Sequence, residues 1–132
     1  MPKTLILIPS RLSARRLPGK PLLKINSLSI ISHVVKRAQE SKVGETYVAT
    51  EDKEIVEDVE KNGGRAILTS RNHKTGSDRI FECFQKLNFK DVDYIINLQG
   101  DEPNINVDDL RNLDLLVKKN NASSIFFDLK TS

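Results

Sequence analysis

Short apolar runs alternate with amphipathic segments of helical length along the whole chain. The apolar runs that are typical of buried strands are Thr4–Ile8, Thr46–Ala49, Ala66–Leu68, Tyr94–Leu98 and Ser124–Phe127. The segments with apolar residues at helical spacing are Ser29–Glu40, Lys53–Lys61, Ser77–Leu87 and Val107–Lys119. Strands that alternate with helices in this way form βαβ units. The sequence therefore predicts a three-layer, Rossmann-like α/β domain with a mainly parallel sheet.

The composition restricts the class of protein further. The chain has 132 residues, which fits one domain, 1–132, and its 21 basic and 18 acidic residues give a net charge of +3. This balance does not indicate a nucleic-acid-binding protein or a membrane surface protein. The one cysteine, Cys83, excludes an intrachain disulfide framework and fits a reducing compartment. No apolar run is long enough to span a membrane, and the N-terminal residues do not resemble a signal peptide, so we expect a cytoplasmic protein.

A loop rich in basic residues follows the first predicted strand, which we expect to stop at Pro9. This loop carries Arg11, Arg15, Arg16 and Lys20 and no acidic residue. Clustered positive charges repel one another unless water or an anion screens them, and open α/β sheets bind ligands at the carboxyl ends of their strands. The loop therefore predicts a phosphate site, with a solvated basic loop as the alternative. It has neither the Walker pattern nor the Gly-x-Gly-x-x-Gly fingerprint of dinucleotide-binding proteins.

Two further loops with candidate chemistry follow predicted strands. The first, His73–Arg79, has small and polar residues just before a helix, where free backbone N–H groups can bind an anion. A simple helix N-cap at Ser77 explains the same residues. The second loop, Gln99–Pro103, places Asp101 after a buried strand and a glycine, as in sites that hold Mg²⁺ against nucleotide phosphates. An ordinary turn would also favour an acidic residue there.

Taken together and in this order, the motifs resemble those of the 3-deoxy-manno-octulosonate cytidylyltransferases, also called CMP-Kdo synthetases. The residues that carry the resemblance are Ile8-Pro9-Ser10-Arg11, Arg16-Leu17-Pro18-Gly19-Lys20-Pro21-Leu22, Val48-Ala49-Thr50, His73, Gly76-Ser77-Asp78-Arg79 and Asn97-Leu98-Gln99-Gly100-Asp101-Glu102-Pro103. The resemblance extends from about residue 4 to residue 120. It implies a nucleotidyltransferase fold and the Mg²⁺-dependent transfer of CMP from CTP to the sugar acid Kdo, with release of pyrophosphate, for lipopolysaccharide synthesis.

The resemblance also implies roles for individual residues. By matching position, the residues expected to bind CTP are Pro9, Arg11, Arg16, Lys20, His73, Ser77, Arg79 and Gln99. Arg16 and Lys20, which would hold the triphosphate, and Asp101 are the expected catalytic residues. Asp101 is also the expected Mg²⁺ ligand. The expected partners are CTP and Kdo, with no nucleic acid and no membrane, and the family's full-length proteins are expected to be homodimers.

The chain departs from the family pattern in several places. Ala14 stands where the family usually has serine, Glu51 where it has aspartate and Ser77 where it has threonine. The chain is also shorter than family members, so we expect it to hold the CTP-binding part of the domain. The sugar-acid pocket, a second metal-binding aspartate and most dimer contacts would then lie past Ser132.

Three other functions stay open at the level of the sequence. The chain could be a CTP-binding fragment that does not complete the reaction, or a cytidylyltransferase for another sugar acid such as sialic acid. A basic-loop module for polyanions such as RNA is the third, although Tyr47 and Tyr94 both lie in predicted strands and are not interleaved with the basic residues. We expect Cys83 and His33 to be structural, because both lie among apolar helix positions.

Overall fold

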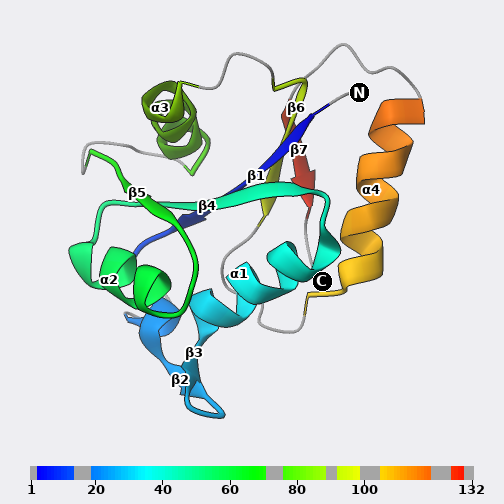
Figure 1. Cartoon of the computed structure of the whole chain (residues 1–132). Helices are drawn as coiled ribbons and strands as arrows, with labels where there is room; N and C mark the ends of the chain where they lie inside the picture. Colours follow the sequence, from blue (N-terminus) through cyan, green and yellow to red (C-terminus); the bar gives the residue numbers. More distant parts are fainter. Residues whose placement is uncertain are drawn as a thin grey trace.

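The computed structural model describes residues 3–13, 19–70, 76–88, 92–98, 105–119 and 126–129. In chain order the elements are β1 (Thr4–Ser10), the 3₁₀ turn η1 (Lys20–Leu22), β2 (Lys24–Ile25), β3 (Leu28–Ser29), α1 (Ile30–Ser41), β4 (Gly44–Thr50), α2 (Lys53–Lys61), β5 (Ala66–Leu68), α3 (Gly76–Leu87), β6 (Tyr94–Leu98), α4 (Val107–Lys119) and β7 (Phe126–Leu129). The main sheet has the strand order β5-β4-β1-β6-β7, and every pairing in it is parallel (Figure 1). The predicted parallel α/β architecture is confirmed.

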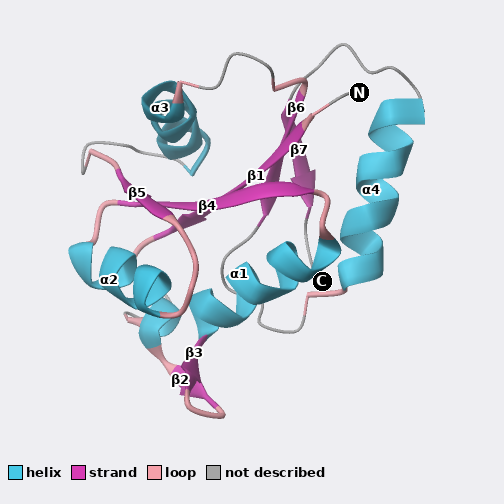
Figure 2. Ribbon diagram, in the orientation of Figure 1, coloured by secondary structure: helices cyan, strands magenta, loops and turns pink. Residues whose placement is uncertain are grey.

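Helices cover both faces of the sheet, as the ribbon shows (Figure 2). Side chains alternate across β1, so that Ile6 and Ile8 pack on one face while Leu5 and Leu7 pack on the other. The first face packs against α1, α2 and α4, and the second packs against α3. These two apolar layers bury the central strand completely, which explains why its residues form an almost continuous apolar run.

Capping residues mark the start of α1, the start of α4 and the end of α2. The Ser29 hydroxyl accepts a hydrogen bond from the backbone N–H of Ser32 at the start of α1. Asn106 does the same for α4, because its side chain accepts the N–H of Asp108 at 2.8 Å. After α2, Gly63 takes the left-handed conformation with φ +88°, which a glycine adopts without strain.

The first strand is longer than predicted, and the expectation that it stops at Pro9 was wrong. Pro9 and Ser10 continue in register with Ala49 and Thr50 of β4. Proline has no N–H to donate to a neighbouring strand, so it is tolerated in a strand only where that one hydrogen bond is not needed. Among the described residues, the pairing recorded at Pro9 is with Ala49 of β4.

Other boundaries differ modestly from the prediction. β4 starts two residues earlier, at Gly44, and ends one residue later, at Thr50. β7 runs from Phe126 to Leu129, whereas Ser124–Phe127 was predicted; residues 124 and 125 lie outside the described ranges. The small β2–β3 hairpin was not predicted. Among the described helices, none has both the length and the apolar character needed to cross a membrane.

Candidate functional site at the carboxyl edge of the sheet

The carboxyl ends of β1, β4, β5 and β6 lie at one edge of the sheet, because these strands are parallel. The chain first adds β4 and β5 on one side of β1 and then crosses to add β6 on the other side. In open α/β sheets, such a reversal of strand order leaves a crevice in which ligands bind. The strands that precede the three candidate loops of the sequence, β1, β5 and β6, therefore end at the same edge.

The end of β1 presents an unpaired hydroxyl at this edge. Ser10 is the last residue of β1 and lies in register with Thr50, the last residue of β4. Its Oγ atom is buried and has no hydrogen-bond partner in the part of the chain that the structure describes. Pro9, before it, is half-buried, and Arg11, after it, is exposed. A buried polar atom without a partner is costly, so this hydroxyl favours a ligand group at the end of β1.

The two ends of the basic loop, at Leu12 and Gly19, are held together, and we call this pair of residues the neck of the loop. The backbone N–H of Gly19 donates to the carbonyl of Leu12 at 2.8 Å, which joins the two ends of the loop. Leu12 and Leu22 pack against the core, and Lys20 begins η1 in a half-buried position. The positive φ of Gly19, +79°, allows the sharp return of the chain. The neck therefore brings Lys20 back beside the end of β1.

Arg79 is the buried cation of the site. It lies in the first turn of α3, and only 3% of its surface is exposed. Its Nε–H donates to the Thr69 hydroxyl at 3.3 Å, and its Nη2 lies 3.7 Å from Oε2 of Glu51. Nη2 is also buried and makes no hydrogen bond to any of the described residues. The guanidinium is thus charge-balanced by Glu51 but keeps donors for a further acceptor.

The surroundings of Arg79 come from two strand ends. Glu51 follows β4 directly, and Thr69 follows β5. The backbone N–H of Thr69 donates to the carbonyl of Thr50 at 2.7 Å, which continues the β4–β5 pairing past its last strand residues. Because these backbones are held together, the partners of Arg79 are fixed with respect to Ser10 at the end of β1.

The predicted site residues divide into two groups. Pro9, Arg11, Lys20 and Arg79 lie within the described residues, and the topology brings them to the carboxyl edge. Ser77 is the second residue of α3, which begins at Gly76, so the alternative of an N-cap at Ser77 was wrong. The other predicted residues, Arg16, His73, Gln99 and Asp101, lie outside the described residues.

The structure adds residues that sequence reasoning missed. Glu51, Asp52 and Thr69 contact the predicted basic groups or their loop, and Ser10 offers the unpaired hydroxyl. A usable signal was present, because two acidic residues come directly after a buried strand whose end lies at the ligand-binding edge. Within the described parts of the chain, no three His, Cys, Asp or Glu side chains gather in an arrangement that could hold a metal ion.

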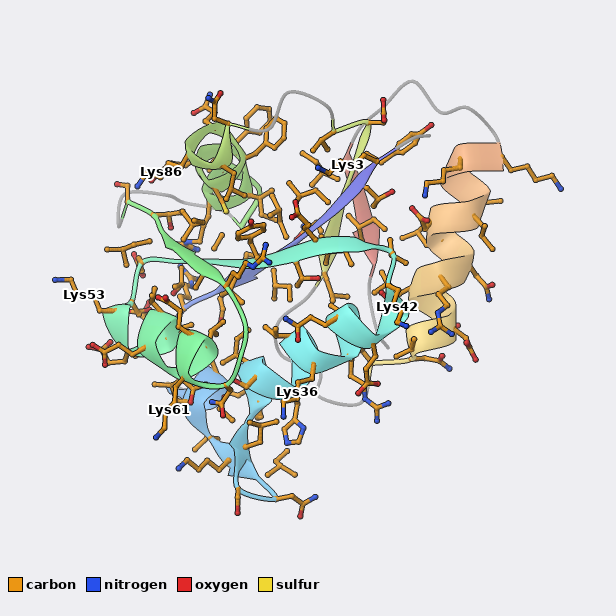
Figure 3. The ribbon with its side chains drawn as sticks, viewed as in Figure 1. Lys3, Lys36, Lys42, Lys53, Lys61 and Lys86 are labelled. Carbon is orange, nitrogen blue, oxygen red and sulfur yellow. The ribbon has the colours of Figure 1, made fainter. Side chains whose placement is uncertain are left out.

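Many other basic residues lie on the outside of the molecule. Figure 3 shows Lys53 and Lys61 projecting outward from α2, and both are exposed. Lys86 on α3 is exposed as well, but its Nζ donates to the carbonyl of Leu68 at the end of β5, at 2.7 Å. Lys53 and Lys61 therefore differ from Arg79, whose charge is buried at the carboxyl edge.

Comparison with known proteins agrees with this geometry. A family model described as cytidylyltransferase matches residues 5–131. A 3-deoxy-manno-octulosonate cytidylyltransferase from Rhodopseudomonas palustris strain BisB18 is 48% identical over 110 residues, which are 83% of this chain and 45% of the relative. The enzyme of the same name from Afipia carboxidovorans is 49% identical over 109 residues, or 82% of this chain and 44% of the relative. The chain thus spans about half the length of the curated relatives it matches.

Solved structures of cytidylyltransferases are also similar to this chain over most of its length. The structure of a CMP:2-keto-3-deoxy-manno-octonic acid synthetase in complex with CTP has a TM-score of 0.84 and 40% identity; the match covers 91% of this chain and 49% of that one. A cytidylyltransferase from Leptospira borgpetersenii has a TM-score of 0.79 and 30% identity, and the match covers 91% of this chain and 50% of the other.

Proposed function

Because the chain belongs to the cytidylyltransferase family, we propose that it binds CTP at the carboxyl edge of its sheet and forms the nucleotide-binding part of a Kdo cytidylyltransferase. The reaction transfers CMP from CTP to Kdo. The observation that carries the proposal is the buried Arg79, whose Nη2 has no hydrogen-bond partner among the described residues, at the same edge as the Ser10 hydroxyl, for which the described residues also supply no partner. Both groups can form hydrogen bonds with a polar ligand, which would replace the hydrogen bonds to water that the groups lose on burial.

The chemistry of the proposed reaction explains the distribution of cations. The anomeric hydroxyl oxygen of the sugar acid attacks the α-phosphorus of CTP, and the bond from that phosphorus to the pyrophosphate oxygen breaks. Negative charge grows on the departing pyrophosphate, so basic groups beside it lower the barrier. Arg11, Arg16 and Lys20 on the basic loop would do this. Arg79, together with His73 and Ser77, would lie along the nucleotide.

The remaining site residues complete the proposal. Pro9 and Gln99 would line the pocket for the cytidine. Asp101 would hold Mg²⁺, which when bound supplies positive charge to the phosphate oxygens. The catalytic residues of the site would be Arg16, Lys20 and Asp101. The names of the similar proteins favour Kdo over sialic acid as the acceptor, with a product for lipopolysaccharide synthesis. A homodimer and a cytoplasmic location belong to the same proposal.

A second candidate has its own observation. Because the matches cover only 45% and 44% of the curated relatives, the chain would act as a CTP-binding part that does not complete the transfer. Measurement of pyrophosphate release from CTP with Kdo and Mg²⁺ separates the two. Turnover on the order of 1 per second or faster would favour the complete enzyme, and binding without release would favour the second candidate.

Calorimetric titration with CTP and ATP, each with Mg²⁺, tests the nucleotide. We expect tighter binding of CTP, and equal affinities would reduce the site to a general triphosphate site. The Lys20→Ala and Arg16→Ala variants should weaken CTP binding about ten-fold or more and CMP binding less, because charge-assisted hydrogen bonds to the outer phosphates are lost. Lys53→Ala is the matched control, since Lys53 is an exposed lysine on the outside of α2.

The metal is tested by Asp101→Asn. The amide keeps the shape of the side chain but removes the charge that a divalent cation needs. CTP binding by this variant should no longer depend on Mg²⁺. A variant with normal Mg²⁺ dependence would move the metal site to another acidic residue, with Asp78 in the first turn of α3 as the next candidate.

A further inference from the structure

Asp52 stands at the N-cap of α2 but does not cap that helix with its side chain. It precedes Lys53, and its backbone carbonyl accepts the first helical hydrogen bonds, from Ile55 and Val56. An aspartate in this place commonly accepts an N–H from the first turn of its own helix. No such bond forms here. Instead, Oδ2 of Asp52 accepts the backbone N–H of Leu12, 40 residues earlier in the chain, at 2.8 Å.

This bond holds the neck of the basic loop. Leu12 makes two hydrogen bonds through its backbone: its N–H donates to Oδ2 of Asp52, and its carbonyl accepts the N–H of Gly19. The Leu12 side chain packs against the core as well. Leu12 is therefore fixed by three kinds of contact, while Arg11 just before it and Lys20 just after Gly19 carry the charges.

Asp52 itself is rigidly placed. Its backbone N–H donates to the Thr50 hydroxyl at 3.1 Å, and Thr50 is completely buried at the end of β4. Only 7% of the Asp52 surface is exposed, so the carboxylate is shielded from water and its hydrogen bond with Leu12 is stronger for that. The end of β4 thus fixes the entry of the loop that leaves β1.

We propose that Asp52 is a positioning residue, which fixes the neck of the basic loop through Leu12 and so places Arg11 and Lys20 against the triphosphate. This inference rests on the proposed function, in which the loop meets the outer phosphates of CTP. It adds a residue to the site that acts through the backbone and does not touch the nucleotide. The negative charge of Asp52 would by itself repel a triphosphate. A positioning role and a purely electrostatic role therefore predict opposite changes in CTP affinity when this charge is removed.

The variants are Asp52→Ala, which removes the acceptor, and Asp52→Asn, which keeps an acceptor oxygen without the charge. If Asp52 positions the loop, Asp52→Ala weakens CTP binding about ten-fold, the effect of one lost hydrogen bond to a charged group, and changes CMP binding less than about two-fold. Asp52→Asn should stay within about three-fold of the unmodified chain. If Asp52 acted only by its charge, both variants would bind CTP more tightly, and the inference would be wrong.

Asp93 provides the matched control. Its Oδ2 accepts the backbone N–H of Lys3 at 2.8 Å, the same type of contact, where β1 and β6 begin at the opposite edge of the sheet. Asp93→Ala should leave the ratio of CTP to CMP affinity unchanged, even if it lowers the stability of the fold. An equal change of this ratio in Asp93→Ala and Asp52→Ala would assign the effect to general destabilisation and overturn the inference.

Amide hydrogen exchange tests the anchor without a nucleotide. In Asp52→Ala the amides of Leu12 and Gly19 should exchange at least about ten-fold faster, because the neck opens locally, while amides in the middle of β1 keep their protection. Unchanged exchange at Leu12 would refute the anchor itself. Failure of the unmodified chain to bind CTP would instead refute the proposed function, so the two failures are distinguishable.

Discussion

The buried pair formed by Arg79 and Glu51 gives the most specific prediction about energetics. Their side chains are 4% and 9% exposed, and the charged atoms lie 3.7 Å apart. Glu51→Gln removes the charge and keeps the shape, which leaves the guanidinium buried without its counter-charge. Arg79→Met removes the opposite charge and keeps an unbranched side chain. The double variant removes both charges together.

The expected magnitude follows from distance and burial. With an effective dielectric constant of about 20, two unit charges 3.7 Å apart attract by about 4.5 kcal/mol, part of which offsets their desolvation. We expect Glu51→Gln alone to lower the free energy of unfolding by about 3 kcal/mol, the lower end for a broken buried pair. At about 3–4 °C per kcal/mol for a chain of this size, the melting temperature falls by about 10 °C.

Urea denaturation of the two single variants and the double variant, followed by circular dichroism, measures the coupling between the residues. It should be about 1–3 kcal/mol, so that the double variant is more stable than the sum of the single changes implies. The pair of Lys86 and Glu82 is the control. Its atoms are closer, at 3.1 Å, but Lys86 is 52% exposed, so its coupling should be about 0.5 kcal/mol or less. Additive effects for Arg79 and Glu51, within about 0.5 kcal/mol, would refute the reasoning that burial makes this pair strong.

Further predictions concern the thiol and the glycines. Burial raises the pKa of the Cys83 thiol to about 12, from 9.0 in an exposed cysteine, so it should not react with an aromatic disulfide reagent at pH 8 until the protein is unfolded. Because the unfolded thiol ionises first, the free energy of unfolding should fall as the pH rises from about 9 to about 12, and a Cys83→Ala variant should lack this part of the pH dependence. Gly44→Ala should lower the free energy of unfolding by about 3 kcal/mol or more, since its Cβ would lie 1.9 Å from the carbonyl oxygen of Thr4. Gly63→Ala, with open space around it but a φ of +88°, should cost about 1–2 kcal/mol in the same denaturation assay, and equal losses at the two glycines would contradict this.

Periodicity predicted the helices and most strands well, because burial follows the same pattern. The apolar stripe of α1, from Ile30 to Ala38, is buried throughout, and α2 and α4 have the predicted bounds. The prediction of Cys83 as a core residue is also confirmed. These elements each bury one side on the sheet, so a local pattern contains enough information to place them.

The errors have a physical origin in contacts that a local pattern does not contain. Pro9 continues β1 in register with Ala49 of β4, 40 residues later in the chain, and a local pattern does not contain this pairing. The β2–β3 hairpin turns at Asn26 and Ser27, whose φ values are +52° and +70°. Such turns usually contain glycine, so the turn signal in the sequence was weak.

The candidate site was predictable only in part, because several of its contacts join residues that are far apart in the sequence. Motifs identified the basic loop and Arg79, and the alternation of strands and helices placed their ends at one edge. The partners Glu51, Asp52 and Thr69 were not found, because each contacts a segment distant in sequence. Where Gln99 and Asp101 lie relative to these residues stays a prediction from the motifs.

The central position of β1 has a consequence for synthesis of the chain. Thr4 pairs with Gly44 on one side and with Tyr94 on the other, so β1 gains its second neighbour only after about 80 further residues have been synthesised. Contacts between residues so far apart in sequence slow folding. Until β6 has emerged from the ribosome, the apolar residues Leu5–Ile8 have an open strand edge, which is a template for pairing with other chains. A nascent chain of this topology is therefore expected to need protection by a chaperone between the synthesis of β1 and that of β6.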